Sequence, residues 1–324
     1  MPKRPHISFV IAARNGEHDK SFLVRLRTVL RLRSAFAARH KLSCEFIIVQ
    51  YNPPMNQPFY EETLADLATD AMPIRIITVP ESFHKKIAPG RRGPFLEYVA
   101  KNIGIRRAHG EFILSTNLDI VYSDEMVARL TQPLEKDAVY EARCRDLNIR
   151  EIADSVDPDM ALVMCRDHVD RVWTEHGLFY VSWSRWFRRF LNKPKPKNLW
   201  MAPLFNPIRK WLAGQPVIKD VAAGHFTLAH RDAWATVRGY DQQKLIDSYL
   251  DSYVIGMFAC NGFKQIVLPQ PIYHIKHNIN PALAHQDTQT ITRDMRAMAA
   301  TGIPYATYPE NWGYPKEQFA ESVL

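Results

Sequence analysis

Short apolar runs alternate with amphipathic stretches over the first 120 residues of the chain. Four runs are continuous, apolar and rich in β-branched side chains, as in strands buried on both faces of a sheet: residues 7–13, 45–50, 74–79 and 111–116. Three stretches have helical apolar spacing or the terminal proline and glycine signals of helices: residues 20–40, 60–70 and 94–109. This alternation predicts an α/β fold with a mainly parallel central sheet flanked by helices.

Polar and turn-forming segments follow each of the four predicted strands. In open α/β sheets, ligands bind at the carboxyl ends of the strands, near the point where the strand order reverses. The segments at these ends are Arg14-Asn15-Gly16, Gln50 to Pro54, Pro80 to His84, and Asn117-Leu118-Asp119. We therefore expect the ligand-binding residues among them.

Composition narrows the class of protein. Hydrophobic residues make up 46% of the chain, yet no window approaches the run of roughly 18 to 20 apolar residues that a membrane-spanning helix needs. The basic N-terminus leads directly into a strand-like run, without the separate apolar segment of a signal peptide. The four cysteines lie far apart and form no C-x-x-C pair, which argues against disulfides or a zinc site. These features predict a cytoplasmic protein.

Asp119 stands just past the last predicted strand, at the carboxyl edge of the sheet. A carboxylate there can hold Mn²⁺ or Mg²⁺, which prefer oxygen ligands and bridge to the oxygens of a diphosphate. Such a metal stabilises the negative charge of a departing nucleoside diphosphate. The position makes Asp119 a candidate metal ligand, with an ordinary turn residue at the end of a strand as the alternative.

Residues 100–119 also carry a recognisable pattern, A-x-N-x-G-I-x-x-A-x-G-E followed by an apolar strand and N-L-D. The pattern resembles the central segment of family-2-type glycosyltransferases with the GT-A fold, in which a D-x-D element binds the metal and the donor diphosphate. The resemblance implies a metal role for Asp119 and donor contacts for Asn117 and Leu118. Asn117 stands where the first aspartate of the motif usually lies, which lowers the negative charge of the site.

Three further segments resemble that family, in the same order along the chain. The N-terminal ISFVIAARN is similar to its first strand and donor-base contact, which implies donor contacts for Ala13, Arg14 and Asn15. Residues 222–241 are similar to a segment near the acceptor side. Residues 247–262 occupy the place of a segment with a catalytic base, which implies this role for Asp251, or for Asp247 if the register shifts by one helical turn.

The segment PIYHIKHN, residues 271–278, contains two histidines. In many GT-A enzymes a C-terminal histidine completes the metal shell, so the resemblance implies His274 or His277 as a further ligand. The implied reaction starts with Asp251, which removes a proton from an acceptor hydroxyl whose oxygen then attacks the anomeric carbon. The donor is a nucleotide-diphosphate sugar, UDP- or GDP-linked, and the acceptor a saccharide or lipid-linked molecule of polysaccharide or glycolipid synthesis.

The end of the second strand departs from the family-2 pattern. Residues 50–54 read QYNPP, which resembles the N-P-P turn of some exostosin-like transferases that retain anomeric configuration. Gln50 and Asn52 are candidate donor contacts there, as are Lys101 and Asn102 in the predicted helix. The basic segment 84–93 is a candidate mobile loop over the donor, with phosphate contacts from its arginines. An aspartate base favours inversion, and the N-P-P turn leaves retention open.

A basic, aromatic insertion is predicted near 171–216. The chain has a net charge of +8 and a pI of about 9.3, which favours polyanionic or phosphorylated partners. Within the insertion, residues 182–213 interleave arginines and lysines with tryptophans and phenylalanines at partly helical spacing. Such helices lie in a membrane interface, here the cytoplasmic face, or wall the acceptor cleft. Both interpretations stay open.

The sequence thus predicts a GT-A domain over 1–280 and a helical or irregular tail over 281–324. Three rivals remain. A sugar-nucleotide pyrophosphorylase calls for a glycine-rich basic loop after the first strand, where only Gly16 stands. A nucleic-acid-binding module fits the charge, but no recognition motif is evident and the acidic residues around 247–251 oppose a phosphate track, so no nucleic-acid partner is expected. A catalytically degenerate GT-A-like protein is the third.

Overall fold

The computed structural model describes residues 4–15, 21–69, 72–90, 93–175, 177–181, 221, 223–245, 249–277, 289–304 and 309–324 of the chain. Its first half alternates strands and helices as the sequence predicts. The elements are β1 (Ile7–Ala13), α1 (Phe22–Arg39), β2 (Cys44–Tyr51), α2 (Tyr60–Leu64), the 3₁₀ turn Ala65–Leu67, β3 (Ile74–Val79), α3 (Glu81–Ile87), α4 (Glu97–Arg107) and β4 (Phe112–Thr116).

The second half contains more strands, several of them short. The elements are β5 (Ile120–Tyr122), α5 (Asp124–Leu130), β6 (Ala138–Leu147), α6 (Pro158–Asp167), β7 (Val169–Thr174), β8 (Gly177–Tyr180), β9 (Phe226–His230), α9 (Arg231–Val237), α10 (Leu250–Cys260), β10 (Lys264–His274), α11 (Gln289–Thr301) and β11 (Ala320–Val323).

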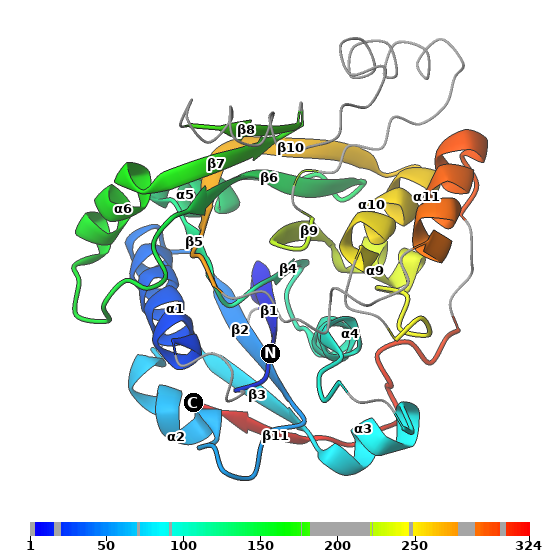
Figure 1. The fold of residues 1–324 in the computed structure, drawn as a ribbon, viewed down its shortest axis with the longest axis horizontal. Coiled ribbons are helices and arrows are strands. Elements are labelled where there is room, and N and C mark those ends of the chain that lie inside the picture. The colour runs from blue at the N-terminus through cyan, green and yellow to red at the C-terminus, as the bar shows by residue number, and fades with distance from the viewer. Residues whose placement is uncertain are drawn as a thin grey trace, which may run out of the picture.

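One central sheet joins all these strands, in the order β11-β3-β2-β1-β4-β9-β6-β10-β5, with β7 and β8 attached to β6 (Figure 1). The pairs from β3 through β2 and β1 to β4 are parallel, which confirms the predicted parallel centre. Beyond β4 the sheet is mixed, because β9 runs antiparallel to both β4 and β6. The predicted α/β class is confirmed, and its parallel character belongs to the first half of the chain.

Helices cover both faces of the sheet. Alternate residues of β1 belong to two separate buried clusters, so Phe9 packs on one face and Val10 on the other. Helices α1, α2, α5 and α6 contribute to the first cluster, and α3, α4, α9, α10 and α11 to the second. In Figure 1 the two groups lie on opposite sides of the strands. No helix in the described part of the chain is long and apolar enough to span a membrane.

Two local predictions need correction. The helix predicted over 60–70 ends at Leu64 and continues only as a 3₁₀ turn to Leu67. The segment 84–93, predicted as a mobile loop, is helical up to Ile87, since Phe83 anchors α3 in the core beside aromatic residues of the C-terminal segment. Residues 182–213 of the predicted insertion lie outside the described residues.

The strand directions bring several predicted site segments to one edge. The carboxyl ends of β1, β2 and β4 point to this edge because these strands are parallel. Strand β9 starts there, with Phe226 paired to Thr116. Strands β6 and β10 end there as parallel neighbours, with Asp146 opposite His274. Residues from six strands therefore lie along this edge.

Candidate metal centre and its surroundings

Asp119, His274 and His277 form a compact cluster at this edge. The Nε2 atom of His277 lies 3.2 Å from Asp119 Oδ2, and the Nε2 atom of His274 lies 3.8 Å from the same oxygen. One ligand atom from each residue can be chosen so that all lie within 4.8 Å of one another. The structure thus brings together the three residues that the sequence predicts as metal ligands.

The loop that carries Asp119 is held from two sides. Its carbonyl accepts a hydrogen bond of 3.0 Å from the backbone of Ile275, which ties it to the chain that carries both histidines. From beneath, the buried guanidinium of Arg33 donates to the carbonyls of Asn117 (3.1 Å) and Ile120 (2.7 Å). These backbone contacts fix the position of Asp119 before any ligand arrives.

Two polar atoms in the cluster have no hydrogen-bond partner. They are Asp119 Oδ1 and His274 Nε2, and both are buried. A buried polar atom left without a partner costs free energy and calls for an explanation, such as an ion. A divalent cation held by these atoms and His277 would satisfy both, so the residues present fit a metal. One carboxylate and two imidazoles suit Mn²⁺ and similar transition metals.

The electrostatics of the cluster point the same way. Burial disfavours the charge on Asp119, but the three histidines around it outweigh burial and hold the pKa of this carboxyl well below its usual range. Burial likewise opposes the charge on His274, but Asp119 and Asp146 outweigh it and raise its pKa to about 9. The nearby His225 has a pKa lowered to about 3, chiefly by burial and then by His274. Asp119 and Asp146 thus stabilise positive charge on His274.

Asp251, the predicted base, lies next to the metal cluster. It stands in the first turn of α10 and packs against Gly224, so closely that a β-carbon on Gly224 would meet Asp251 Oδ2 at 2.5 Å. The ring of the following residue, His225, packs against that of His274 with centroids 4.4 Å apart. Only the short turn of Gly224 and His225 therefore separates Asp251 from the histidines of the cluster. Asp247, the alternative base, lies outside the described residues.

Lys101 links the loop that carries Asp119 to the turn that contains Gly224. Its ammonium is 1% exposed and donates to Asn117 Oδ1 (2.8 Å) and to the Gly224 carbonyl (3.3 Å). It also pairs with Glu97 at 2.7 Å. Burial opposes its charge, but carboxylates, first Glu97 and later Asp251, outweigh burial and raise its pKa. The side chain of Asn117 is thus held by Lys101, and that of Asp119 faces the histidines.

Asn102, another predicted donor contact, is completely buried. Its amide nitrogen donates to the Tyr240 carbonyl (2.9 Å) and to Gln242 Oε1 (3.1 Å), and its oxygen accepts from the Tyr240 backbone (2.8 Å). The protein therefore uses both ends of this amide. Its role as a donor contact stays a prediction, and its observed contacts fix the segment 240–242 on α4.

The remaining predicted donor contacts lie at the ends of β1 and β2. The Arg14 guanidinium donates to the Asn52 carbonyl at 2.8 Å, and Asn52 donates to the Pro94 carbonyl at 2.8 Å with a left-handed φ of 47°. Asn15 donates to Gln57 at 3.2 Å. Three further predicted contacts are buried or partly buried in the core near this edge: Ala13, Gln50 and Leu118. The structure brings Arg14, Asn15 and Asn52 together around the N-P-P turn.

Four residues of the site were not predicted: Arg33, Glu97, Asp146 and His225. Only His225 lay in a segment that the sequence singled out, 222–241. Arg33 and Glu97 stand in helices whose patterns explain them as solvated charges. Asp146 ends a strand, and its contacts depend on a pairing between strands more than 120 residues apart.

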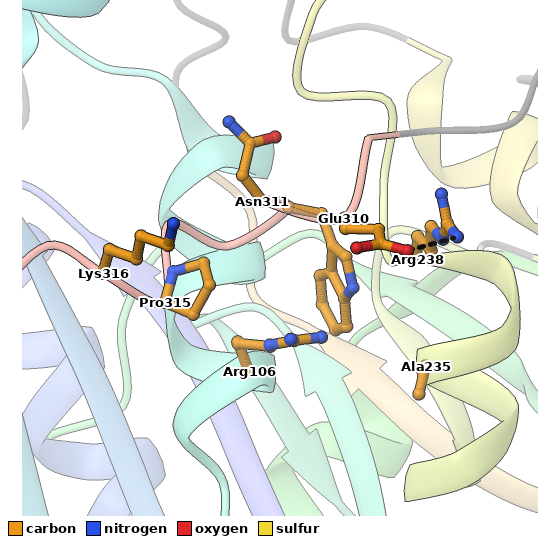
Figure 2. Close-up of a pocket in the computed structure, with 8 residues that line it drawn as sticks. Arg106, Ala235, Arg238, Glu310, Asn311, Pro315 and Lys316 are labelled. Atoms are coloured by element: carbon orange, nitrogen blue, oxygen red, sulfur yellow. Dashed lines mark ion pairs between the residues drawn. The ribbon is translucent and has the colours of Figure 1, made fainter.

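A pocket of about 400 Å³ lies elsewhere, between α4, α9 and residues 310–316 (Figure 2). Arg106 contributes from α4 and Arg238 from the position that follows α9, and Glu310 pairs with Arg238 at 3.8 Å. The Arg106 guanidinium stacks on Trp312 at 4.8 Å from the ring centroid. No residue of the metal cluster lines this pocket, so we assign it no part in the candidate site.

Comparisons with known proteins give likenesses of fold alone. No protein-family model matches the chain, and no curated protein matches it in sequence. Solved structures with similar folds include GalNAc-T7 with UDP, GalNAc and Mn²⁺ (13% identity, TM-score 0.46, 91% of this chain and 48% of that one) and S. aureus TarS (10% identity, TM-score 0.47, 94% and 40%). Another is the catalytic domain of Drosophila β1,4-galactosyltransferase 7 with xylobiose (10% identity, TM-score 0.42, 90% and 79%).

These structural neighbours are glycosyltransferases of the GT-A type, the architecture that the sequence predicts. The chain spans about half the length of the first two structures, or less. At these TM-scores the likeness carries no argument about chemistry, so the function rests on the site itself.

Proposed function

We propose that the protein is a metal-dependent glycosyltransferase that moves a sugar from a nucleotide-diphosphate sugar to an acceptor hydroxyl. The observation that carries this proposal is the partly buried Asp119–His274–His277 cluster, with two buried ligand atoms that have no hydrogen-bond partner, beside the carboxylate of Asp251. A cation site and a carboxylate base next to each other are what such a transfer needs. The sequence resemblance at residues 100–119 supports the donor class.

The roles of the residues follow from this arrangement. Asp119, His274 and His277 hold the divalent cation, which when bound offsets the charge of the departing diphosphate. Asp251 takes the proton of the acceptor hydroxyl. The acceptor oxygen forms the new bond to the anomeric carbon as the bond from that carbon to the diphosphate breaks. Arg14, Asn15 and Asn52, which lie around the N-P-P turn, contact the donor. A saccharide or lipid-linked acceptor is part of the proposal.

The first test is thermal stabilisation by UDP-, GDP-, dTDP- and CMP-linked compounds, each with and without Mn²⁺. A ligand that binds the native state raises the free energy of unfolding, by roughly 2.7 kcal/mol at a hundredfold excess over its dissociation constant. We expect one nucleotide class to stabilise the protein in the presence of Mn²⁺. We expect Asp119→Ala to abolish this shift.

The matched control is Asp154→Ala, which removes a carboxylate paired with Arg27 and Arg31 on the surface. This variant should keep the metal-dependent shift. Binding without turnover, with any acceptor tried, would favour the degenerate GT-A-like alternative. The absence of a shift with every nucleotide, in a protein that folds, would contradict the proposal.

A further inference from the structure

Asp146 touches the metal cluster through His274. The two residues are direct neighbours on the parallel strands β6 and β10, and Asp146 Oδ1 lies 2.9 Å from His274 Nδ1. Both side chains are largely buried, with 6% of the Asp146 side chain and 16% of the His274 side chain exposed. The other ring nitrogen, Nε2, is the atom of His274 that faces Asp119.

The second oxygen of Asp146 is held by two different donors. Trp173 Nε1 donates to Oδ2 at 2.9 Å, and the Arg171 guanidinium lies 2.7 Å from the same atom. Tryptophan and arginine side chains can only donate hydrogen bonds. They therefore fix which oxygen of Asp146 faces them and leave Oδ1 for His274.

We propose that Asp146 is a positioning residue of the metal site, which keeps a proton on Nδ1 of His274 and directs Nε2 to the cation. The inference rests on the proposed function, since the cation is the same one. A histidine that binds a metal through one nitrogen commonly donates its other N–H to a carboxylate, which fixes the ring and its tautomer. The ring of His225, tilted by 32° with its centroid 4.4 Å away, limits rotation of His274 further.

A second metal at Asp146 is the competing interpretation. Cys144, Asp146 and His225 also place ligand atoms within 4.8 Å of one another. However, three donors already occupy the two oxygens of Asp146, from His274, Trp173 and Arg171. A second cation would compete with these donors, one of which is the positively charged Arg171 guanidinium, so we assign Asp146 to the site of Asp119.

Two substitutions of Asp146 distinguish a role in positioning His274 from a purely structural role. In Asp146→Asn, the amide oxygen must face Trp173 and Arg171, because both only donate. The amide NH₂ then faces His274 Nδ1 and donates to it, which forces the ring proton onto Nε2 and blocks the metal. In Asp146→Ala, His274 loses its orientation but can still present a free Nε2.

The test is Mn²⁺ affinity by calorimetry for the wild type and both variants, without any nucleotide. We expect Asp146→Ala to weaken binding about 10- to 100-fold, and Asp146→Asn to weaken it by more than about 100-fold. If Asp146 had only a structural role, Asp146→Asn would weaken Mn²⁺ binding less than Asp146→Ala, since asparagine keeps the shape of the aspartate side chain. The control is Glu45→Gln, another carboxylate that is 5% exposed and bound to an arginine, at the other edge of the sheet. It should leave Mn²⁺ affinity unchanged.

A second readout needs no variant. In ¹⁵N spectra of the Zn²⁺-loaded wild type, His274 should carry its proton on Nδ1 and the metal on Nε2; metal on Nδ1 would overturn the inference. The inference would also be overturned if Asp146→Asn bound Mn²⁺ as tightly as Asp146→Ala or more tightly. In that case, a Mn²⁺-dependent thermal shift with a nucleotide would leave the proposed function standing. A wild type that binds no divalent metal would overturn both.

Discussion

The carboxylate of Asp251 lies against Gly224, where the added β-carbon of any other residue would come within 2.5 Å of Asp251 Oδ2. The three nearest atoms around that position all belong to Asp251. Gly224 also presents its carbonyl to Lys101, at 3.3 Å. The absence of a side chain at Gly224 thus sets where the proposed base stands relative to the metal cluster.

Gly224→Ala should therefore reduce turnover far more than stability. The clashing atom is the end of a rotatable side chain, so Asp251 can turn away, and we expect a loss of about 1 kcal/mol in the free energy of unfolding, the lower end of what overpacking costs. A displaced base, however, can lower kcat by about 100-fold. Turnover of the donor found in the thermal screen, together with denaturant unfolding, measures both.

A double-mutant cycle isolates the cause. If the clash with Asp251 is the mechanism, Gly224→Ala should have almost no further effect on stability or turnover in an Asp251→Ala background, because the β-carbon of residue 251 lies at an ordinary 3.7 Å. Additive effects of the two substitutions would show that Gly224 acts in some other way.

Asn117→Asp should change metal affinity little. The sequence compares Asn117 with the first aspartate of a D-x-D motif, but its Oδ1 accepts a 2.8 Å hydrogen bond from Lys101. An aspartate there would pair with the buried ammonium. We expect the Mn²⁺ affinity of the variant, measured by calorimetry, to lie within about threefold of the wild-type value. This is a smaller change than the roughly 1.4 kcal/mol in binding free energy that a tenfold change represents. A rise of tenfold or more would mean that residue 117 can reach the metal.

The sequence predicted the strands, and it singled out the three candidate metal ligands, for identifiable reasons. Continuous apolar runs such as 7–13 and 45–50 can be buried only as central strands, and the structure places them in the middle of the sheet. Asp119 and the two histidines were selected because they match the order of motifs in family-2-type glycosyltransferases. Their mutual distances were not predictable, since they depend on the pairing of β5 with β10, which places Ile120 opposite His274.

The residues that the sequence missed act through such long-range pairings. Asp146 depends on the pairing of β6 with β10, and Arg33 reaches the Asp119 loop from a helix 84 residues earlier in the chain. In the sequence both look like ordinary charged residues. The mixed second half of the sheet was missed for a related reason, because short strands such as β5 and β9 carry no periodic signal of their own.

The site should prefer Mn²⁺ to Mg²⁺. Two of its three ligands are imidazole nitrogens, whereas Mg²⁺ favours oxygen ligands in near-octahedral arrangement. We expect Mn²⁺ to bind at least about tenfold more tightly in parallel titrations of the nucleotide-free protein. His277→Asp, which replaces a nitrogen ligand by oxygen, should narrow this difference. Equal affinities in the wild type would argue that the histidines do not bind the metal.

Lys101→Met should destabilise the protein substantially. The substitution leaves Asn117 Oδ1 and the Gly224 carbonyl without their donor and Glu97 without its counter-ion. Removing one partner of a buried charge pair costs about 3 to 5 kcal/mol, and the partial exposure of Glu97 places the expected loss near 3. The control is Lys85→Met, whose exposed pair with Glu81 should contribute less than about 1 kcal/mol. Similar losses in urea unfolding would contradict this account of Lys101.

Metal affinity and metal-free stability should respond to pH in opposite directions. In the folded metal-free protein, burial opposes the charge on His274, yet Asp119 and Asp146 raise its pKa from 6.5 to about 9. Below pH 9 a cation must displace the proton on Nε2, so Mn²⁺ affinity should rise between pH 6.5 and 8.5, by up to about tenfold per unit.

The same raised pKa stabilises the metal-free fold below the unfolded value of 6.5, and this contribution is lost as the pH rises through about 9. Urea unfolding in EDTA should therefore show stability falling over the interval in which calorimetry shows Mn²⁺ affinity rising. Both slopes should flatten in His274→Gln, which cannot take up the proton. If the slopes persist in that variant, another group is responsible and His274 is not the ligand that the geometry indicates.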